Sequence, residues 1–508
     1  MSEFPQSADI PNRETVQVAT IQTLDLARGG TRSEHDLLGE AEVPADAYWG
    51  IHTLRAVGNF PITGVPVGHF PDLVRALALV KLAAARANRR LGALSVAKAE
   101  AIELACLRIA TRGHFHDQFV VDAIQGGAGT STNMNANEVI ANLALEILGK
   151  PKGDYASLHP NDDVNMSQST NDAYPTALRL AVIFAAEPMI AALDDLAYAF
   201  KAKAVEFSDV IKIGRTQLQD AVPMTLGQEF DACFATIKED VSRLKEVSAL
   251  FREINLGATA IGTGITADPR YAALAVEELA RVARQPLVPA SNMIEATSDM
   301  GAFVLFSGVL KRVAVKLSKI ASDLRLLASG PRAGFAEIRL PAVQAGSSIM
   351  PGKVNPVIPE VVNQVAYLVI GLDLAVTMCA EGGQLQLNAF EPTIGYSLLS
   401  SLRYLTAAIG TLTTRCVNGI EADRERCRAL VDDSIGLVTA LGPTLGYEAS
   451  SRVAKRALAE RRQVADIVLE EGLLTRAQLD ELLHIEAMTA PARLKSAAPM
   501  GAGGSEPR

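Results

Sequence analysis

The chain has 508 residues, of which 49% are hydrophobic but only 5% aromatic, and its formal net charge is −9. A core without many rings must be built from Ala, Leu, Val and Ile, and this favours helices packed on helices. The acidic balance and the lack of any Lys/Arg-rich block argue against nucleic acid as a partner.

The five cysteines are dispersed without a C-x-x-C pair, so we expect reduced core thiols in a cytoplasmic protein. The N-terminal stretch carries Glu3 and Asp9 and lacks an apolar segment, which predicts that no signal peptide is present. No uncharged apolar run approaches the roughly 20 residues of a membrane span, so we expect no membrane partner. His114 and His116 are the only close histidine pair, and we expect no metal there.

In chain order, polar aperiodic ends flank three expected domains. A first helix is expected at about Asp72–Leu91, and shorter, more charged helical segments follow Glu421. The strongest helical periodicity lies between these regions. The predicted divisions are a disordered extension at 1–35, an N-terminal domain at 36–168, a central long-helix bundle domain at 169–420, a small C-terminal helical domain at 421–496 and a disordered tail at 497–508.

The central domain is predicted from rows of apolar residues spaced alternately three and four apart. The longest row runs from Phe303 to Leu327, and shorter rows run from Phe230 to Phe251 and from Val362 to Cys379. Leu178–Phe207 and a run to Ile420 that Pro392 interrupts supply further expected helices. The fold class is therefore mainly α, with short strands expected near Val43 or Ile338, and exposed apolar stripes on such helices favour assembly.

One loop, Gly346–Pro356 with the sequence GSSIMPGKVNP, carries unusual chemistry. Its glycines can take positive φ, so the loop can point backbone N–H groups inward as an anion nest. Pro359 and Glu360 open a helix whose positive end lies beside it. Its polar side chains are Ser347, Ser348, Lys353 and Asn355. The loop therefore favours negative charge, although a Gly/Pro connector with a solvated lysine has the same composition.

Three further stretches are rich in Gly, Ser, Thr and Asn: Gly126–Glu138, His159–Asp172 and Gly214–Ala221. Each precedes a helical run, so helix capping is one interpretation, in particular for Thr130 and Ser169. Capping does not explain why so many hydroxyls and amides are adjacent. A polar binding site is the other interpretation.

Together, the loop and these stretches resemble the signature regions of the aspartate ammonia-lyases (aspartases) of the class II fumarase/aspartase superfamily, from about Leu37 to Ala490. The resemblance implies a homotetramer with a shared helical core, active sites each shared by three subunits, and neither cofactor nor metal. It also implies the reversible deamination of L-aspartate to fumarate and ammonia. By motif, Ser347 matches the catalytic base, and the substrate-binding positions match Thr130, Ser169, Thr170, Asn171, Thr216, Gln217, Ser348, Lys353 and Asn355.

The chemistry explains these residue types. Removal of the weakly acidic C3 proton of L-aspartate produces a dianionic enediolate, whose charge must be met by preorganised donors. Ser347 is ordinarily too weak a base, but the nest and Lys353 would stabilise its alkoxide.

Several alternatives remain open from the sequence. Fumarase-like members carry His where this chain has Gln217, paired with a carboxylate at the position of Glu360. A fumarate hydratase is therefore the first alternative, a lyase for a bulkier N-substituted succinate is more distant, and a catalytically silent structural homologue is a third. Glu360 is then either a carboxylate that takes part in the reaction or only an acidic residue that stabilises the helix N-terminus. The segment His159–Asp162 resembles a secondary anion site of fumarases, with capping as the other interpretation.

Overall fold

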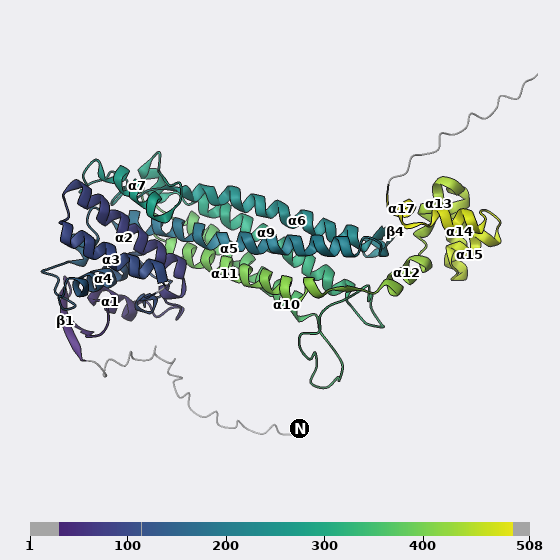
Figure 1. Ribbon diagram of the computed structural model, residues 1–508, viewed down its shortest axis with the longest axis horizontal. Helices are drawn as coiled ribbons and strands as arrows, with labels where there is room; N and C mark the ends of the chain where they lie inside the picture. The colour runs from purple at the N-terminus through teal and green to yellow at the C-terminus, as the bar shows by residue number, and fades with distance from the viewer. Residues whose placement is uncertain (1–29, 113, 491–508) are drawn as a thin grey trace, which may run out of the picture. The chain divides into compact units, whose positions relative to one another are not determined.

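The computed structural model describes residues 30–112 and 114–490 (Figure 1). The predicted tail at 497–508 and most of the predicted extension at 1–35 lie outside the described residues. The chain is mainly helical and forms two compact units that alternate along the sequence. Unit 1 comprises Met1–Phe184, Leu250–Val304 and Ala375–Leu399, and unit 2 comprises Ala185–Ala249, Leu305–Leu374 and Ser400–Arg508.

Unit 1 holds a helical layer in which α2 packs against α3, α4 and α7. The prediction of a helix at Asp72–Leu91 is confirmed by α2, with Pro71 in its first turn and Gly92 ending it at φ 76°. The elements of this unit are β1 (Thr31–Asp36), β2 (Gly39–Pro44), α1 (Ile51–Asn59), η1 (Val67–His69), α2 (Pro71–Leu91), α3 (Val96–Arg112), η2 (His116–Gln118), α4 (Thr130–Ile147), η3 (Pro160–Val164), β5 (Glu253–Ile254), α7 (Tyr271–Ala283), β6 (Val288–Pro289) and α8 (Met293–Ser298).

Order begins earlier than the sequence predicted, because β1 starts at Thr31 inside the expected disordered extension. The strand pairs antiparallel with β2, from Thr31 opposite Pro44 to Asp36 opposite Gly39. The Arg32 guanidinium also donates to the carbonyl oxygens of Pro44, Ala45, Ala47 and Trp49. These bonds fix a polar segment that has no apolar periodicity of its own.

The long helices are α5 (Thr170–Glu206), α6 (Leu226–Ser248), α9 (Gly301–Leu327), α10 (Val357–Glu381) and α11 (Glu391–Arg415). In unit 2 their segments run alongside one another (Figure 1). The Phe200 and Phe230 rings join α5 to α6 at 5.7 Å between centroids. Asp373 of α10 accepts from Ser307 and Lys311 of α9. The predicted long-helix bundle is confirmed.

The apolar row predicted from Phe303 to Leu327 is buried throughout, with no member more than 6% exposed. Two helix starts differ from the prediction. Helix α5 begins at Thr170, eight residues before Leu178, and Pro392 opens α11 instead of interrupting it. In both cases the apolar pattern starts later than the backbone helix.

Gly214–Ala221 was interpreted as a stretch that precedes a helix, but it forms an antiparallel hairpin of β3 (Ile211–Thr216) and β4 (Gln219–Thr225). Gln217 and Leu218 make its two-residue turn with φ of 53° and 61°, as a type I′ turn requires. Helix α6 begins only after β4, where Thr225 and Gln228 form a capping box. The hairpin was missed because its turn lacks the usual Asn or Gly.

The remaining elements of unit 2 are short. The strand expected near Ile338 is confirmed by β7, and the strand expected near Val43 is confirmed by β2 of unit 1. Thr475 and Gln478 form the capping box that the sequence pattern indicates. The remaining elements of unit 2 are η4 (Ala249–Arg252, which runs into unit 1), β7 (Ile338–Arg339), η5 (Val417–Gly419), β8 (Glu421–Ala422), α12 (Arg424–Asp433), α13 (Leu437–Leu445), α14 (Tyr447–Glu460), α15 (Val464–Glu470), α16 (Arg476–Leu482) and α17 (Ile485–Thr489).

Two helices, α5 and α10, are long and apolar enough to cross a membrane by length and composition alone. This qualifies the expectation from the sequence, which considered only uncharged runs. Most of the apolar stretch of α5 is buried in the protein, as in the core helix of a soluble protein, whereas only a third of that of α10 is buried. The exposed apolar side chains of α10 are Val361, Tyr367, Leu368, Leu374 and Met378.

Candidate active site

The first group of predicted site residues, in unit 1, lies at the N-termini of two helices. Thr130 is the first residue of α4, after Gly129 in the left-handed conformation at φ 87°. The Thr130 side chain is exposed, and its hydroxyl donates to the Gly127 carbonyl oxygen at 2.7 Å. The hydroxyl oxygen therefore keeps its lone pairs, and the positive end of the helix dipole favours an anion beside it.

Gly129 is required for close packing as well as for its positive φ. A Cβ atom at this position would lie 2.5 Å from the Tyr174 ring of α5. The start of α4 therefore lies directly against the first turns of α5, and this brings Thr130 into the same region as Ser169, Thr170 and Asn171.

The residues at the start of α5 are held by local hydrogen bonds. Ser169 Oγ accepts from the Asn171 backbone N–H at 3.2 Å, so the capping interpretation is confirmed for this side chain. Thr170 Oγ1 accepts from Asn133 Nδ2 at 3.2 Å, and Asn171 Nδ2 donates to the Ala260 carbonyl oxygen at 2.7 Å. Each side chain is partly buried and fixed in direction.

A charged layer beneath this group was missed by the sequence analysis. Asp172 is fully buried and accepts from the backbone N–H groups of Ser169, Gly257 and Thr259 at 2.9–3.0 Å. Burial raises the pKa of Asp172 to about 6, although these three N–H groups oppose the rise. Lys81 of α2 is also fully buried. A lone lysine in the apolar run of α2 was the signal that could have found this layer.

The signature loop Gly346–Pro356, in unit 2, has neither helix nor strand, as predicted. Ser347 Oγ accepts from the backbone N–H groups of Ile349 and Met350 at 3.2 and 3.0 Å. The expected nest therefore surrounds the oxygen of the predicted base. The two N–H donors belong to the backbone, so they could not be assigned from residue types.

The ends of the loop are tied together. The Gly346 N–H donates to the Lys353 carbonyl oxygen at 2.8 Å, and Asn355 Nδ2 donates to the Gly346 carbonyl oxygen at 2.7 Å. Gly352 has the expected positive φ of 84°, whereas Gly346 does not. Gly346 is required for close approach instead, because a Cβ atom there would lie 2.5 Å from the Lys353 carbonyl oxygen.

A pocket of about 600 Å³ adjoins the loop, and its lining includes Lys353, Asn355, Arg325 and Arg339. Arg339 is paired with Asp423. Arg325 lies 3.9 Å from Glu360, in the first turn of α10. Lys353 is exposed. Asp423 also lines the pocket, so its basic side chains, Lys353, Arg325 and Arg339, outnumber one acidic side chain, and this suits a carboxylate ligand.

Thr216 and Gln217 lie at the tip of the β3–β4 hairpin, and both side chains are exposed. Below the tip, Arg215 donates to the fully buried Glu337 at 2.8 Å. Glu337 also lies 3.0 Å from the Lys212 ammonium. This buried charge cluster fixes the base of the hairpin and leaves its tip free to contact a ligand.

The predicted site residues thus form three groups within one chain. The helix N-termini in unit 1 bring together Thr130, Ser169, Thr170 and Asn171. The hairpin tip in unit 2 carries Thr216 and Gln217, and the loop in unit 2 carries Ser347, Ser348, Lys353 and Asn355. Ser348 is exposed.

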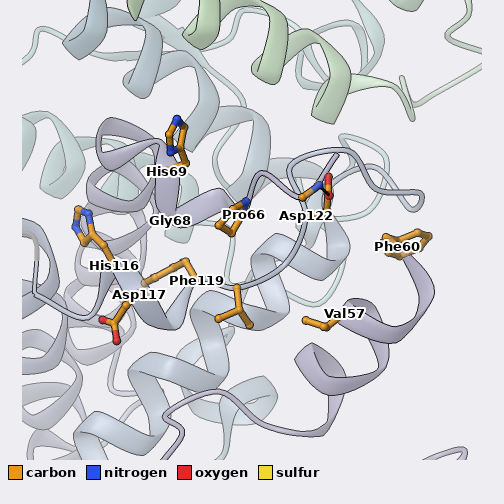
Figure 2. A pocket seen from close by; sticks show the side chains of 11 residues that line it. Val57, Phe60, Pro66, Gly68, His69, His116, Asp117, Phe119 and Asp122 are labelled. Carbon is orange, nitrogen blue, oxygen red and sulfur yellow. Dashed lines mark hydrogen bonds between the residues drawn. The ribbon is translucent and has the colours of Figure 1, made fainter. Parts of the chain in front are cut away.

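Two other regions are less suited to the chemistry. His159 Nδ1 accepts from the backbone N–H groups of Asn161 and Asp162 at 3.1 and 3.2 Å, which supports its capping role. A pocket of about 520 Å³ in unit 1, shown in Figure 2, has His69 and His116 in its lining but none of the predicted site residues. Its described lining contains no Lys or Arg. Within residues 30–112 and 114–490 no three His, Cys, Asp or Glu side chains cluster as a metal site would require.

Comparison with known proteins relates this arrangement to established families. The family model described as "Lyase" matches residues 39–371, and "Fumarase C C-terminus" matches residues 437–490. An aspartate ammonia-lyase of Pseudomonas canavaninivorans is 64% identical over 461 residues, covering 91% of this chain and 97% of the relative.

Two solved structures are also similar. The fumarate lyase:delta crystallin of Brucella melitensis, in a cobalt-bound crystal structure, has a TM-score of 0.88 and 60% identity, covering 91% of this chain and 100% of the other. The class II fumarase of Schistosoma mansoni has a TM-score of 0.84 and 34% identity, covering 90% of this chain and 98% of the other.

Proposed function

Because the chain belongs to the aspartate ammonia-lyase family within the fumarase/aspartase superfamily, we propose that it catalyses the reversible deamination of L-aspartate to fumarate and ammonia with Ser347 as the base. It is a carbon–nitrogen lyase. The observation that carries the assignment of the base is the pair of backbone N–H groups directed at Ser347 Oγ.

Ser347 abstracts the C3 proton of L-aspartate in this proposal. A neutral serine is a poor base, so the Ser347 hydroxyl first transfers its proton to water and then acts as an alkoxide. The N–H groups of Ile349 and Met350 stabilise that negative charge without titrating themselves. Exposed Lys353, in the same loop, adds a mobile positive charge.

The carbanion formed at C3 is stabilised as an enediolate on the adjacent carboxylate. Lys353 and Asn355 are available for that carboxylate from the loop, with Ser348 as a binding hydroxyl. Thr130, Ser169, Thr170 and Asn171 lie at the positive ends of two helices, which favour the other carboxylate. The Ser169 and Thr170 hydroxyls accept hydrogen bonds within the protein and so keep their own protons for it. Ammonia then leaves C2 as the electron pair of the C3–H bond forms the double bond. No cofactor takes part in these steps.

We propose a homotetramer in which three subunits contribute to each active site. The exposed apolar side chains of α10 support assembly, because large apolar side chains gathered on the surface of one helix are typical of interaction sites. Light scattering at micromolar concentration should give the mass of four chains, and a monomeric mass would contradict the proposal. We also propose a cytoplasmic location, which the five free thiols support.

The direct test of the activity is fumarate formation by the purified protein from L-aspartate, without added cofactor. Fumarate absorbs in the ultraviolet through its conjugated double bond, so the progress curve is continuous. We expect fumarate and ammonia in equal amounts. If the correctly assembled protein forms no fumarate from L-aspartate, the proposed function is overturned.

Fumarate hydratase is the second candidate, favoured by the fold shared with the Schistosoma mansoni class II fumarase. Gln217 opposes it. A leaving hydroxide must be protonated by a general acid, whereas a carboxamide only donates and accepts hydrogen bonds. A leaving amino group already carries its proton. L-Malate should therefore be a poor substrate.

A further inference from the structure

Lys81, near the middle of α2, is a buried ammonium group surrounded by amide oxygens. Its side chain is 0% exposed. Its Nζ donates to the side-chain oxygens of Asn133, Asn165 and Gln168 at 2.7, 2.9 and 2.9 Å. Asn133 belongs to α4, and the other two lie in the segment that leads into Ser169.

The orientation of the three amides is fixed from the other side. Asn133 Nδ2 donates to Asn165 Oδ1 and Thr170 Oγ1 at 3.1 and 3.2 Å. Asn165 Nδ2 donates to the Gln168 carbonyl oxygen, and Gln168 Nε2 to the Val164 carbonyl oxygen. Each amide therefore presents its oxygen to Lys81. Three acceptors match the three protons of an ammonium group, whereas a neutral amine can donate to only two of them.

The charges facing Lys81 are few. Burial lowers the pKa of Lys81 to about 7, and the buried Asp172 carboxylate of α5 opposes the fall. The Cys106 thiol of α3 is the other titratable group near it, while α4 and residues 165–168 contribute amides. In the described part of the chain no carboxylate lies within ion-pair distance of Lys81 Nζ, so its positive charge is only partly neutralised.

We propose that Lys81 is a positioning residue for the substrate-binding segment Ser169–Asn171. It orients the Thr170 hydroxyl through Asn133 and fixes the backbone before Ser169 through Asn165 and Gln168. Its charge also favours a dianion at the start of α5. This inference rests on the proposed function, since it assumes that the segment binds a dicarboxylate substrate.

The test uses Lys81→Met in the full-length protein, with Asn142→Ala as the matched control. Asn142 of α4 is also 0% exposed, and its amide donates to the carbonyl oxygens of Tyr48 and Glu138. Both changes therefore remove a buried polar group from unit 1. The probe is succinate, a dicarboxylate without an amino group, measured as a competitive inhibitor of L-aspartate deamination.

We expect Lys81→Met to raise the Ki of succinate at least tenfold and to lower kcat/KM for L-aspartate by about 10²-fold, the usual cost of a misplaced binding group. Asn142→Ala should lower Tm but leave both values near those of the wild type. In the wild type, the Ki of succinate should rise as pH increases through the range where Lys81 loses its proton. In Lys81→Met the Ki should stay constant over that range.

If Lys81→Met does not fold, Asn133→Ala decides the question, because it removes the link between Lys81 and Thr170 but keeps Lys81 and its hydrogen bonds to Asn165 and Gln168. We expect Asn133→Ala, like Lys81→Met, to raise the Ki of succinate. If the variant that folds has the same Ki for succinate and the same kcat/KM for L-aspartate as the wild type, the inference is overturned. A wild-type enzyme that releases no fumarate from L-aspartate would instead overturn the proposed function, so the two failures are distinguishable.

Discussion

Ser347→Ala is the most informative single substitution, because the structure gives a magnitude for it. Two N–H groups contact Ser347 Oγ at 3.2 and 3.0 Å. A hydrogen bond to a charged group contributes about 1.5–3 kcal/mol, so the pair stabilises the alkoxide by about 3–6 kcal/mol. At about 1.4 kcal/mol for each factor of ten, the alkoxide population rises by about 10²–10⁴.

Removing the oxygen removes both the base and this stabilisation. We expect kcat for L-aspartate to fall by at least the 10²–10⁴ that positioned proton transfer typically contributes, while KM changes little. The Tm should be unchanged, because Ile349 and Met350 are exposed and water can satisfy their N–H groups. Steady-state fumarate release and a thermal melt measure these quantities.

Ser348→Ala is the matched control, since it removes the adjacent hydroxyl of the same loop. We expect it to raise KM more than it lowers kcat. If Ser348→Ala abolished turnover while Ser347→Ala remained active, the assignment of the base would be wrong.

Gln217→His should retain part of the deaminase activity and gain malate dehydration, because imidazole can protonate a leaving hydroxide; an unchanged malate rate would show that Gln217 is not the discriminator. Mixing inactive Ser347→Ala and Thr130→Ala proteins should restore partial activity after subunit exchange, whereas no recovery in mixed tetramers would contradict a composite site. Gly129→Ala should lower both Tm and kcat/KM, since its Cβ would lie 2.5 Å from the Tyr174 ring; Gly149→Ala, also at positive φ but with nothing near its Cβ, is the control for backbone strain. Burial lowers the pKa of Lys81 to about 7, below the value of about 10.4 in an unfolded chain. Between these two pH values the native protein binds fewer protons than the unfolded chain, so its Tm should rise with pH. Lys81→Met, melted at equal protein concentration, should lose that rise.

The helices could be predicted from the sequence because their apolar spacing is regular. The row from Phe303 to Leu327 specified α9, and the helix expected at Asp72–Leu91 matches α2. The start of α5 could not be predicted in this way, since Thr170 to Leu178 is polar at its beginning and is fixed by Asp172 and by contacts from distant residues.

The residues of the candidate site were assigned from sequence motifs and stay a prediction, whereas their local geometry could not be obtained from the sequence. Ser347 was assigned by motif, but its N–H donors are backbone groups that no residue type reveals. The hairpin under Thr216 depends on two non-glycine residues at positive φ, which propensity argues against. Lys81 was missed because its partners are amides far away in the sequence, and only the packing of α2 against α4 brings them together.

The most direct measurement of the central claim compares L-aspartate and L-malate as substrates of the wild-type protein under identical conditions. The serine-base deaminase proposed here predicts that kcat/KM for L-aspartate exceeds that for L-malate by on the order of 10²–10⁴, the contribution of one general acid. Comparable values for the two substrates would contradict it and favour the fumarate hydratase.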